Sequence, residues 1–269
     1  MNLTSPSQVK SWCIANGFHP NRTLGQNFLI DRNALESIVN AGELTPSSNV
    51  LEIGPGLGVL TEELLNRGHS VTAIEKDPVL AERLAESLGN PDGLKVVPGD
   101  ALDAVKDGIC DGFDALVSNL PYQAGTRILL DVTTRPESRP ERIVVLVQTE
   151  VAERLAAGPG SKTRGLAGVW TQLDYDVKMV RVVKASCFWP RPQIGSTVVF
   201  MKRHHKNDDV PAAVRETFRK LTKTAFEHRR KQLGAIFKGI IESSARAEDL
   251  SNEDWLDLST ALADAFDGR

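Results

Sequence analysis

VLEIGPGLGVLT, residues 50–61, joins a short apolar run to an amphipathic stretch through three glycines spaced GxGxG. Similar apolar runs follow, separated by segments with helical periodicity: VTAI at 71–74, LKVV at 94–97, FDALV at 113–117 and IVVLV at 143–147. Strands that are apolar throughout and alternate with helices are typical of a parallel sheet covered on both faces. Two later segments, 175–183 and 196–202, predict a strand pair that closes the sheet edge. The sequence therefore predicts an α/β fold.

Helical segments flank this alternating region. Ser5-Pro6 and Gly17 are good start and stop signals for a short N-terminal helix, and Asp31 predicts the N-cap of a second helix that ends near Gly42. After HHKNDD at 204–209, which is typical of a linker, the strand signals stop. Three helices are expected there, at 210–226, 228–240 and 252–266. We therefore predict a catalytic domain over 1–204, with an N-terminal helical extension, and a small helical domain over 205–269.

The composition is that of a globular protein, with 269 residues of which 41% are hydrophobic and 25% charged. The three cysteines, Cys13, Cys110 and Cys187, lie far apart without a CxxC pair, so we expect free thiols and no metal site. No segment has the pattern of a signal peptide, and no run approaches 18 apolar residues. These features predict a cytoplasmic protein without a membrane partner. Nothing in the sequence demands an oligomer, so we expect a monomer.

Charge is unevenly distributed along the chain. Residues 178–238 carry 15 Lys and Arg against 4 Asp and Glu, a net charge of +11, whereas the remainder carries 17 against 31, a net charge of −14. A basic region beside an acidic one is a common electrostatic signature of nucleic-acid binding. Within it, Arg229, Arg230 and Lys231 fall in a predicted helix and are our candidates for RNA phosphate contacts. The alternative is a basic helix face that only meets solvent.

Three features at successive strand ends indicate a ligand site. Glycines 54, 56 and 58 allow a sharp turn and a close backbone approach, Glu75 ends the next strand, and Asp100 follows the third. The GxGxG spacing does not match the GxGxxG loop that holds a pyrophosphate at a helix N-terminus. A carboxylate at Glu75 can accept both ribose hydroxyls, and Asp100 can accept from an adenine amine. The set predicts an adenosyl ligand without phosphates, although each residue alone could be a turn glycine or a capping carboxylate.

Asn119-Leu120-Pro121-Tyr122, at the end of the fourth predicted strand, suggests the reaction. The exocyclic amine of adenine is a poor nucleophile because its lone pair is delocalised into the ring. Acceptors at the Asn119 side-chain carbonyl and the Leu120 backbone carbonyl would direct that lone pair toward a methyl donor, through positioning and preorganised dipoles. Pro121 fixes the backbone, and Tyr122 offers a ring on which the base can stack, worth about 1–3 kcal/mol per base. A simple strand-to-turn segment is the alternative.

A second aromatic element is Phe188-Trp189-Pro190-Arg191-Pro192, followed by Ile194 and Ser196. Its prolines make a stiff loop, so that Phe188 or Trp189 could cover the other face of a flipped-out base. The alternative is that both aromatics pack in the core.

Eight segments occur in the order of a known family: GQNFLID (25–31), VLEIGPGLGVLT (50–61), IEKD (74–77), GDAL (99–102), NLPY (119–122), QTEVAERLAAGPGSK (148–162), FWPRPQIGS (188–196) and AFEHRRKQL (225–233). The set resembles the ribosomal small-subunit RNA adenine N6-dimethyltransferases of the kasugamycin-sensitivity type. The resemblance implies a class I, Rossmann-like S-adenosylmethionine-dependent methyltransferase sheet with a small C-terminal helical domain. It also implies dimethylation of two adjacent adenines near the 3′ end of 16S rRNA, in the small subunit or its precursor. Cofactor contacts are implied at Asn27, Leu29, Gly54, Glu75, Asp100 and Asn119, with Phe188 beside the target base.

Three other functions remain as alternatives. The macrolide-resistance methyltransferases, which act on large-subunit rRNA, are similar, but NLPY in place of their usual NIPY and the segment 225–233 favour the small-subunit enzymes. A non-catalytic assembly factor would not need the intact NLPY segment. A small-molecule methyltransferase would not depend on the basic segment.

Overall fold

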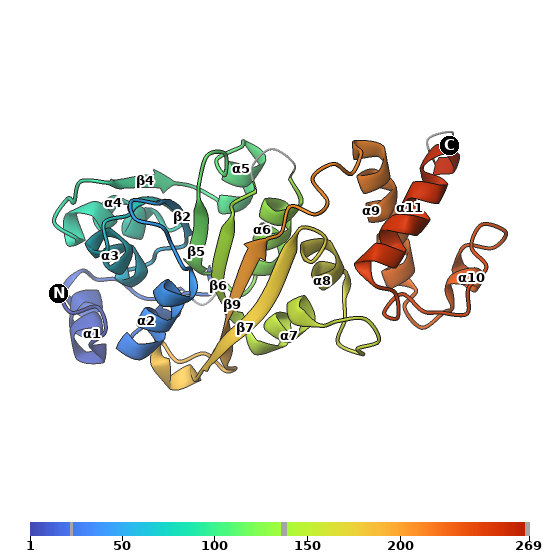
Figure 1. The fold of residues 1–269 in the computed structure, drawn as a ribbon. Coiled ribbons are helices and arrows are strands. Elements are labelled where there is room, and N and C mark those ends of the chain that lie inside the picture. The colour runs from blue at the N-terminus through green and yellow to red at the C-terminus, as the bar shows by residue number, and fades with distance from the viewer. Residues whose placement is uncertain (22–23, 136–138, 267–269) are drawn as a thin grey trace. The chain divides into compact units, whose positions relative to one another are not determined.

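The alternating segments form one mixed sheet in the computed structural model, which describes residues 1–21, 24–135 and 139–266 (Figure 1). The strands are β1 (Phe28–Leu29), β2 (Asn49–Ile53), β3 (Ser70–Glu75), β4 (Leu94–Pro98), β5 (Ala115–Asn119), β6 (Arg142–Gln148), β7 (Tyr175–Val183), β8 (Phe188–Trp189) and β9 (Ser196–Arg203). The helices are α1 (Pro6–Ala15), α2 (Arg32–Ala41), α3 (Val59–Asn66), α4 (Pro78–Ser87), α5 (Ala101–Lys106), α6 (Gly125–Thr134), α7 (Thr149–Ala156), α8 (Leu166–Thr171), the 3₁₀ helix η2 (Ala185–Cys187), α9 (Ala212–Glu227), α10 (Leu233–Ile236) and α11 (Asn252–Phe266).

The main sheet has the strand order β4-β3-β2-β5-β6-β9-β7 within the described residues. The neighbouring strands β4, β3, β2, β5 and β6 are parallel to one another. Strand β9 pairs antiparallel with β6. The predicted strand pair therefore does lie at the sheet edge. Because the parallel strands end together, Glu75 on β3 lies opposite Pro98 on β4, and Asn119 on β5 lies opposite Leu146 on β6. This alignment brings the predicted site residues to one edge.

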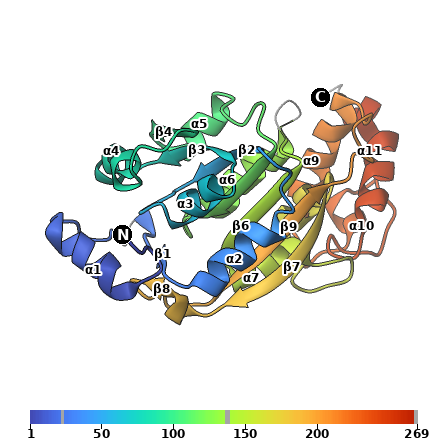
Figure 2. The ribbon, with the colours of Figure 1, turned by 60° about the vertical axis from the view of Figure 1, so that its left-hand side comes forward.

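Both faces of the central strands β2, β3, β5 and β6 are buried, as their apolar runs predict, whereas the edge strand β7 is largely exposed. One face packs against α2, α3 and α4 through a core that includes Ile38, Leu64, Val117 and Val198 (Figure 2 shows α2 lying across β6 and β9). Leu116, which points to the opposite face because strand side chains alternate, is also fully buried. The side chain of Asp31 caps α2 by accepting from the Ala34 N–H at 2.8 Å, as expected.

The chain divides into two compact units. Unit 1 comprises residues 1–152 and 178–203, and unit 2 comprises 153–177 and 204–269. The predicted boundary at 204/205 therefore misses the segment 153–177. The reason is its apolar packing: Val169 and Leu173 share a buried core with Phe218 of α9 and Trp255 of α11. Sequence patterns along 153–177 gave no sign of this core.

Two local predictions were wrong. The stiff loop expected at 188–192 begins with the strand β8, which pairs antiparallel with β1 and sets Phe188 opposite Leu29. Within the helix predicted over 228–240, the α-helical part is α10 (Leu233–Ile236). Helix α9 ends at Glu227, and the segment that begins at Leu233 forms backbone hydrogen bonds with residues 243–245. The Leu233 and Gly234 N–H groups donate to the carbonyls of Ala245 and Ser243 at 2.8 and 2.9 Å.

None of the helices in the described part of the chain combines the length and the apolar character that a bilayer-spanning helix needs.

Candidate active site at the strand ends

The glycine loop leaves β2 with three left-handed residues before α3 begins. Gly54, Gly56 and Gly58 have φ values of 67°, 59° and 89°, a region that side chains rarely adopt. A Cβ at Gly58 would also lie 2.7 Å from Cδ1 of Leu84, so the Leu84 side chain would have to shift. The Gly54 N–H donates to the carbonyl of Ile74 at 2.9 Å and so ties the loop to β3.

Glu75 links this loop to the start of α4. Its Oε2 accepts from the Gly56 N–H at 3.0 Å, and its Oε1 accepts from the Asp77 N–H at 2.8 Å. Burial raises the pKa of Glu75, and the two N–H donors oppose that shift. Each carboxylate oxygen has two lone pairs, so this fixed carboxylate keeps capacity to accept from a ligand.

Asp100 follows β4 and caps α5. Its Oδ1 accepts from the Leu102 N–H at 2.9 Å, and its Oδ2 accepts from Lys76 Nζ at 2.8 Å. The hydrogen bond from Lys76 is the main reason why the pKa of Asp100 is lowered. Among the described residues of the cavity wall, Lys76 is the one basic residue, and this pairing takes up its charge. The described part of the wall therefore offers no unpaired cation to a phosphate.

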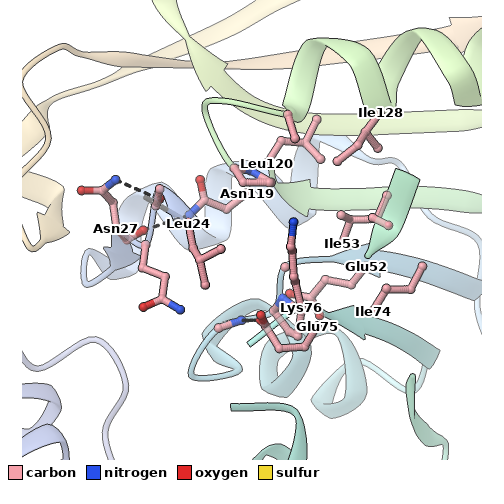
Figure 3. A pocket seen from close by; sticks show the side chains of 18 of the residues that line it. Leu24, Asn27, Glu52, Ile53, Ile74, Glu75, Lys76, Asn119, Leu120 and Ile128 are labelled. Atoms are coloured by element: carbon pink, nitrogen blue, oxygen red, sulfur yellow. Dashed lines mark hydrogen bonds between the residues drawn. The ribbon is translucent and has the colours of Figure 1, made fainter. Parts of the chain in front are cut away.

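Asn119 stands at the end of β5, held by the loop before β1. Its Nδ2 donates to the backbone carbonyl of Asn27 at 3.2 Å, and Asn27 Nδ2 donates to the carbonyl of Gly25 at 3.0 Å (Figure 3). The first bond orients the Asn119 amide and leaves its carbonyl oxygen to accept from a ligand. The Leu120 N–H donates to the carbonyl of Leu146 at 3.2 Å, which fixes the following peptide.

A cavity of about 190 Å³ opens between these strand ends. The predicted residues on its wall come from five separate segments: Asn27, Leu29, Gly54, Gly56, Glu75, Asp100, Asn119, Leu120, Pro121 and Tyr122. Figure 3 shows Asn119 and Leu120 on one side and Glu75 on the other. Spare carboxylate acceptors, a backbone approach without side chains and apolar walls at Ile53 and Ile74 suit an adenosyl group. The contacts of each residue with that group stay predictions.

Phe188 is not on the wall of this cavity. It is 2% exposed and packs in the core with Leu29 and Ile38, which matches the alternative given for it above. The pairing of Phe188 with Leu29 nevertheless places it directly behind a wall residue. A role beside the target base stays a prediction and requires Phe188 to leave this packing. Tyr122 does reach the cavity, and its hydroxyl lies 2.6 Å from Oγ of Ser196, which fixes the ring.

Sequence reasoning assigned no role to Glu52, although it lies on the cavity wall. It is 1% exposed, and its Oε2 accepts from the Thr61 hydroxyl at 2.6 Å. Burial raises the pKa of Glu52 to about 8, against the lowering effect of that hydrogen bond. The available signal was a lone carboxylate inside the otherwise apolar run VLEI.

The three candidate RNA contacts belong to unit 2, where they lie in a turn after α9 instead of on the predicted helix. Arg229 is engaged within the unit: its Nε and Nη2 donate to Glu248 Oε2 at 3.1 and 2.9 Å, and Nη2 donates to the Lys162 carbonyl at 2.8 Å. Arg230 and Lys231 are exposed. Only these two present their charge fully to solvent.

Comparisons with known proteins find relatives over most of the chain. The family model "Ribosomal RNA adenine dimethylase" matches residues 17–264. Ribosomal RNA small subunit methyltransferase A of Ligilactobacillus salivarius is 35% identical, over 97% of this chain and 96% of the relative. The protein of that name from Deinococcus radiodurans is 46% identical, over 73% and 66%.

Two solved structures have similar folds. A dimethyladenosine transferase from Plasmodium falciparum aligns with a TM-score of 0.76 at 22% identity, covering 88% of this chain and 97% of that one. The 23S rRNA methyltransferase ErmE aligns with a TM-score of 0.67 at 26% identity, covering 88% and 99%.

Proposed function

Because this chain belongs to the ribosomal RNA adenine dimethylase family, we propose that it dimethylates N6 of two adjacent adenines near the 3′ end of 16S rRNA. The methyl donor is S-adenosylmethionine, and the reaction would occur during small-subunit assembly. The observation that carries the proposal is the placement of Asn119 and Leu120 on the wall of a cavity that also carries Glu75 and Asp100. The near full-length similarity to proteins named small subunit methyltransferase supports the choice of RNA. A monomeric state and a cytoplasmic location stay predictions.

The residues that would hold the cofactor act through fixed acceptors and backbone. Glu75, anchored by two N–H groups, would accept from the ribose hydroxyls, and Asp100 from the adenine amine. Gly54 and Gly56 let the backbone approach, while Asn27 and Leu29 would close the cavity from the loop before α2. When bound, S-adenosylmethionine supplies a sulfonium methyl group that a weak nucleophile can attack.

Asn119 and Leu120 would activate the adenine amine as the nucleophile that attacks this methyl group. The Asn119 side-chain oxygen and the Leu120 backbone oxygen each accept one N6–H bond, which draws the nitrogen toward tetrahedral geometry and directs its lone pair. Preorganised acceptors of this kind need no reorganisation at the moment of reaction. After the N–C bond forms, the amine gives up one proton to solvent, so no base of the protein is required. Tyr122, its ring fixed through Ser196, would stack on the base.

The 23S rRNA methyltransferase ErmE, as a structural neighbour, makes large-subunit RNA the second candidate substrate. Purified small and large ribosomal subunits that lack adenine dimethylation should be incubated separately with the protein and methyl-labelled cofactor. We expect label in the small subunit only, on the N6 atoms of two adjacent adenines. Label in the large subunit alone would overturn the proposal.

A further inference from the structure

A second, smaller cavity lies on the other side of the NLPY segment, at the carboxyl ends of β5 and β6. Residues 120–122 line both this cavity and the larger one, so the segment separates the two. The remaining walls come from the start of α6, with Gly125 and Thr126, and from the end of β6, with Val147 and Gln148. A base whose amine lies at Asn119 and Leu120 would therefore also lie next to the wall of this smaller cavity.

Gln148 contributes an amide side chain to the wall of this smaller cavity. It ends β6 and pairs in register with Ser196, the residue whose Oγ lies 2.6 Å from the Tyr122 hydroxyl. Two residues before Gln148, the backbone carbonyl of Leu146 accepts a hydrogen bond from the Leu120 N–H of the NLPY segment. Gln148 is half-buried, and its amide forms no hydrogen bond with another side chain or backbone group in the described part of the chain. The amide of Gln148 is thus available to a ligand.

The chemistry of adenine indicates what such an amide can recognise. Both N6–H bonds are used by the Asn119 and Leu120 oxygens in the reaction proposed above. The hydrogen-bonding atoms that remain next to the amine are the ring nitrogens N1 and N7, and both are acceptors. The Gln148 amide supplies two N–H donors on a side chain long enough to cross a small cavity. The other polar side chains on this wall are Thr126, which has a hydroxyl on a short stem, and Tyr122, whose hydroxyl already lies 2.6 Å from Oγ of Ser196.

We propose that Gln148 is a specificity residue that donates a hydrogen bond to N1 or N7 of the target adenine. The inference rests on the proposed function and adds a residue that recognises the adenine ring by a hydrogen bond. A bond to N7 would also select adenine over cytosine, because the cytosine amine has a C5–H group on that side, whereas a bond to N1 would be matched by N3 of cytosine.

The test uses small subunits reconstituted with 16S rRNA whose two target adenines are unmodified, 7-deaza or 1-deaza. Single-turnover methylation and cofactor affinity are measured for the wild type, Gln148→Ala and Gln148→Glu. We expect the wild type to lose about tenfold in rate on one deaza substrate, since one hydrogen bond is removed. Gln148→Ala should lose about tenfold on unmodified RNA and show no further loss on that same deaza substrate. Gln148→Glu, which keeps the size but opposes an acceptor with an acceptor, should be slower than Gln148→Ala.

The outcomes separate the inference from the function on which it rests. A wild type that is insensitive to both deaza substitutions overturns the inference, whatever the variants do. Equal rates of wild type and Gln148→Ala on unmodified RNA overturn it as well. Cofactor affinity within about twofold of wild type in both variants shows that β6 and the larger cavity are intact. If the wild type leaves unmodified small subunits unlabelled, the proposed function itself fails.

Discussion

The strand ends of unit 1 and the charged residues of unit 2 use similar side chains for different purposes. At the strand ends, Glu75 is held by two backbone N–H groups, Asp100 is held by one backbone N–H group and Lys76, and both carboxylates line a cavity. In unit 2, Asp174 and Arg215 form a buried ion pair with both N–O distances at 3.0 Å, and Arg229 is bound to Glu248. A carboxylate held by backbone donors stays available to a ligand, whereas one held by arginine is occupied. Position on the fold therefore decides whether a charge is functional.

The largest effect should come from breaking the buried pair in unit 2. Asp174→Ala leaves the Arg215 guanidinium nearly buried without its carboxylate, and we expect a loss of about 3–5 kcal/mol in the free energy of unfolding. Urea denaturation measures it. Glu36→Ala, which removes the exposed pair with Arg32, is the matched control and should leave the unfolding midpoint nearly unchanged. Similar losses of unfolding free energy in both variants would show that the buried ion pair contributes no more than the exposed one.

A pH-dependent effect is expected from Glu52, the buried carboxyl of the cavity. Its pKa of about 8 in the folded protein lies above the ordinary value of 4.5, so the folded chain keeps a proton that the unfolded chain releases. The free energy of unfolding should therefore fall as pH rises from about 4.5 to 8 and level off above that window. Glu52→Gln keeps an acceptor for Thr61 and should be more stable at pH 8, by a few kcal/mol.

Urea unfolding of the wild type and Glu52→Gln between pH 5 and 9 measures this slope. The variant should retain a weaker slope of the same sign, because burial also raises the pKa of Glu75. An unchanged slope would show that Glu52 is already ionised in the folded protein.

The smallest effect separates two adjacent arginines of unit 2. Arg229→Ala removes the contacts with Glu248 and Lys162, so it should cost about 1 kcal/mol in stability. Arg230→Ala should leave stability unchanged, weaken rRNA binding and reduce the salt slope of log K by about 1. Thermal denaturation and a salt titration of RNA affinity measure both. The reverse pattern would move the phosphate contact to Arg229.

The sheet and most of its site followed from sequence because they depend on local patterns. Apolar runs at regular spacing place strand ends at one edge, and this brought Gly54, Glu75, Asp100 and Asn119 to a common cavity. The features that the sequence did not predict depend on pairing between segments that are far apart in the chain. The pairing of β8 with β1 places Phe188 in the core. Residues 229–231 are not helical, because the segment that follows them forms backbone hydrogen bonds and a β-bridge with residues 243–246. Neither pairing has a periodic signal in the sequence.

The role of Asn119 is tested most directly by Asn119→Ala, with methyl transfer to small subunits and cofactor affinity measured on the same preparation. Since the amide oxygen would accept from the adenine amine, the account predicts a fall in single-turnover rate on the order of 100–1000-fold. Cofactor affinity should stay within about threefold, because that interaction rests mainly on Glu75, Asp100 and the glycine loop. A variant that methylates adenine at the wild-type rate would contradict the account.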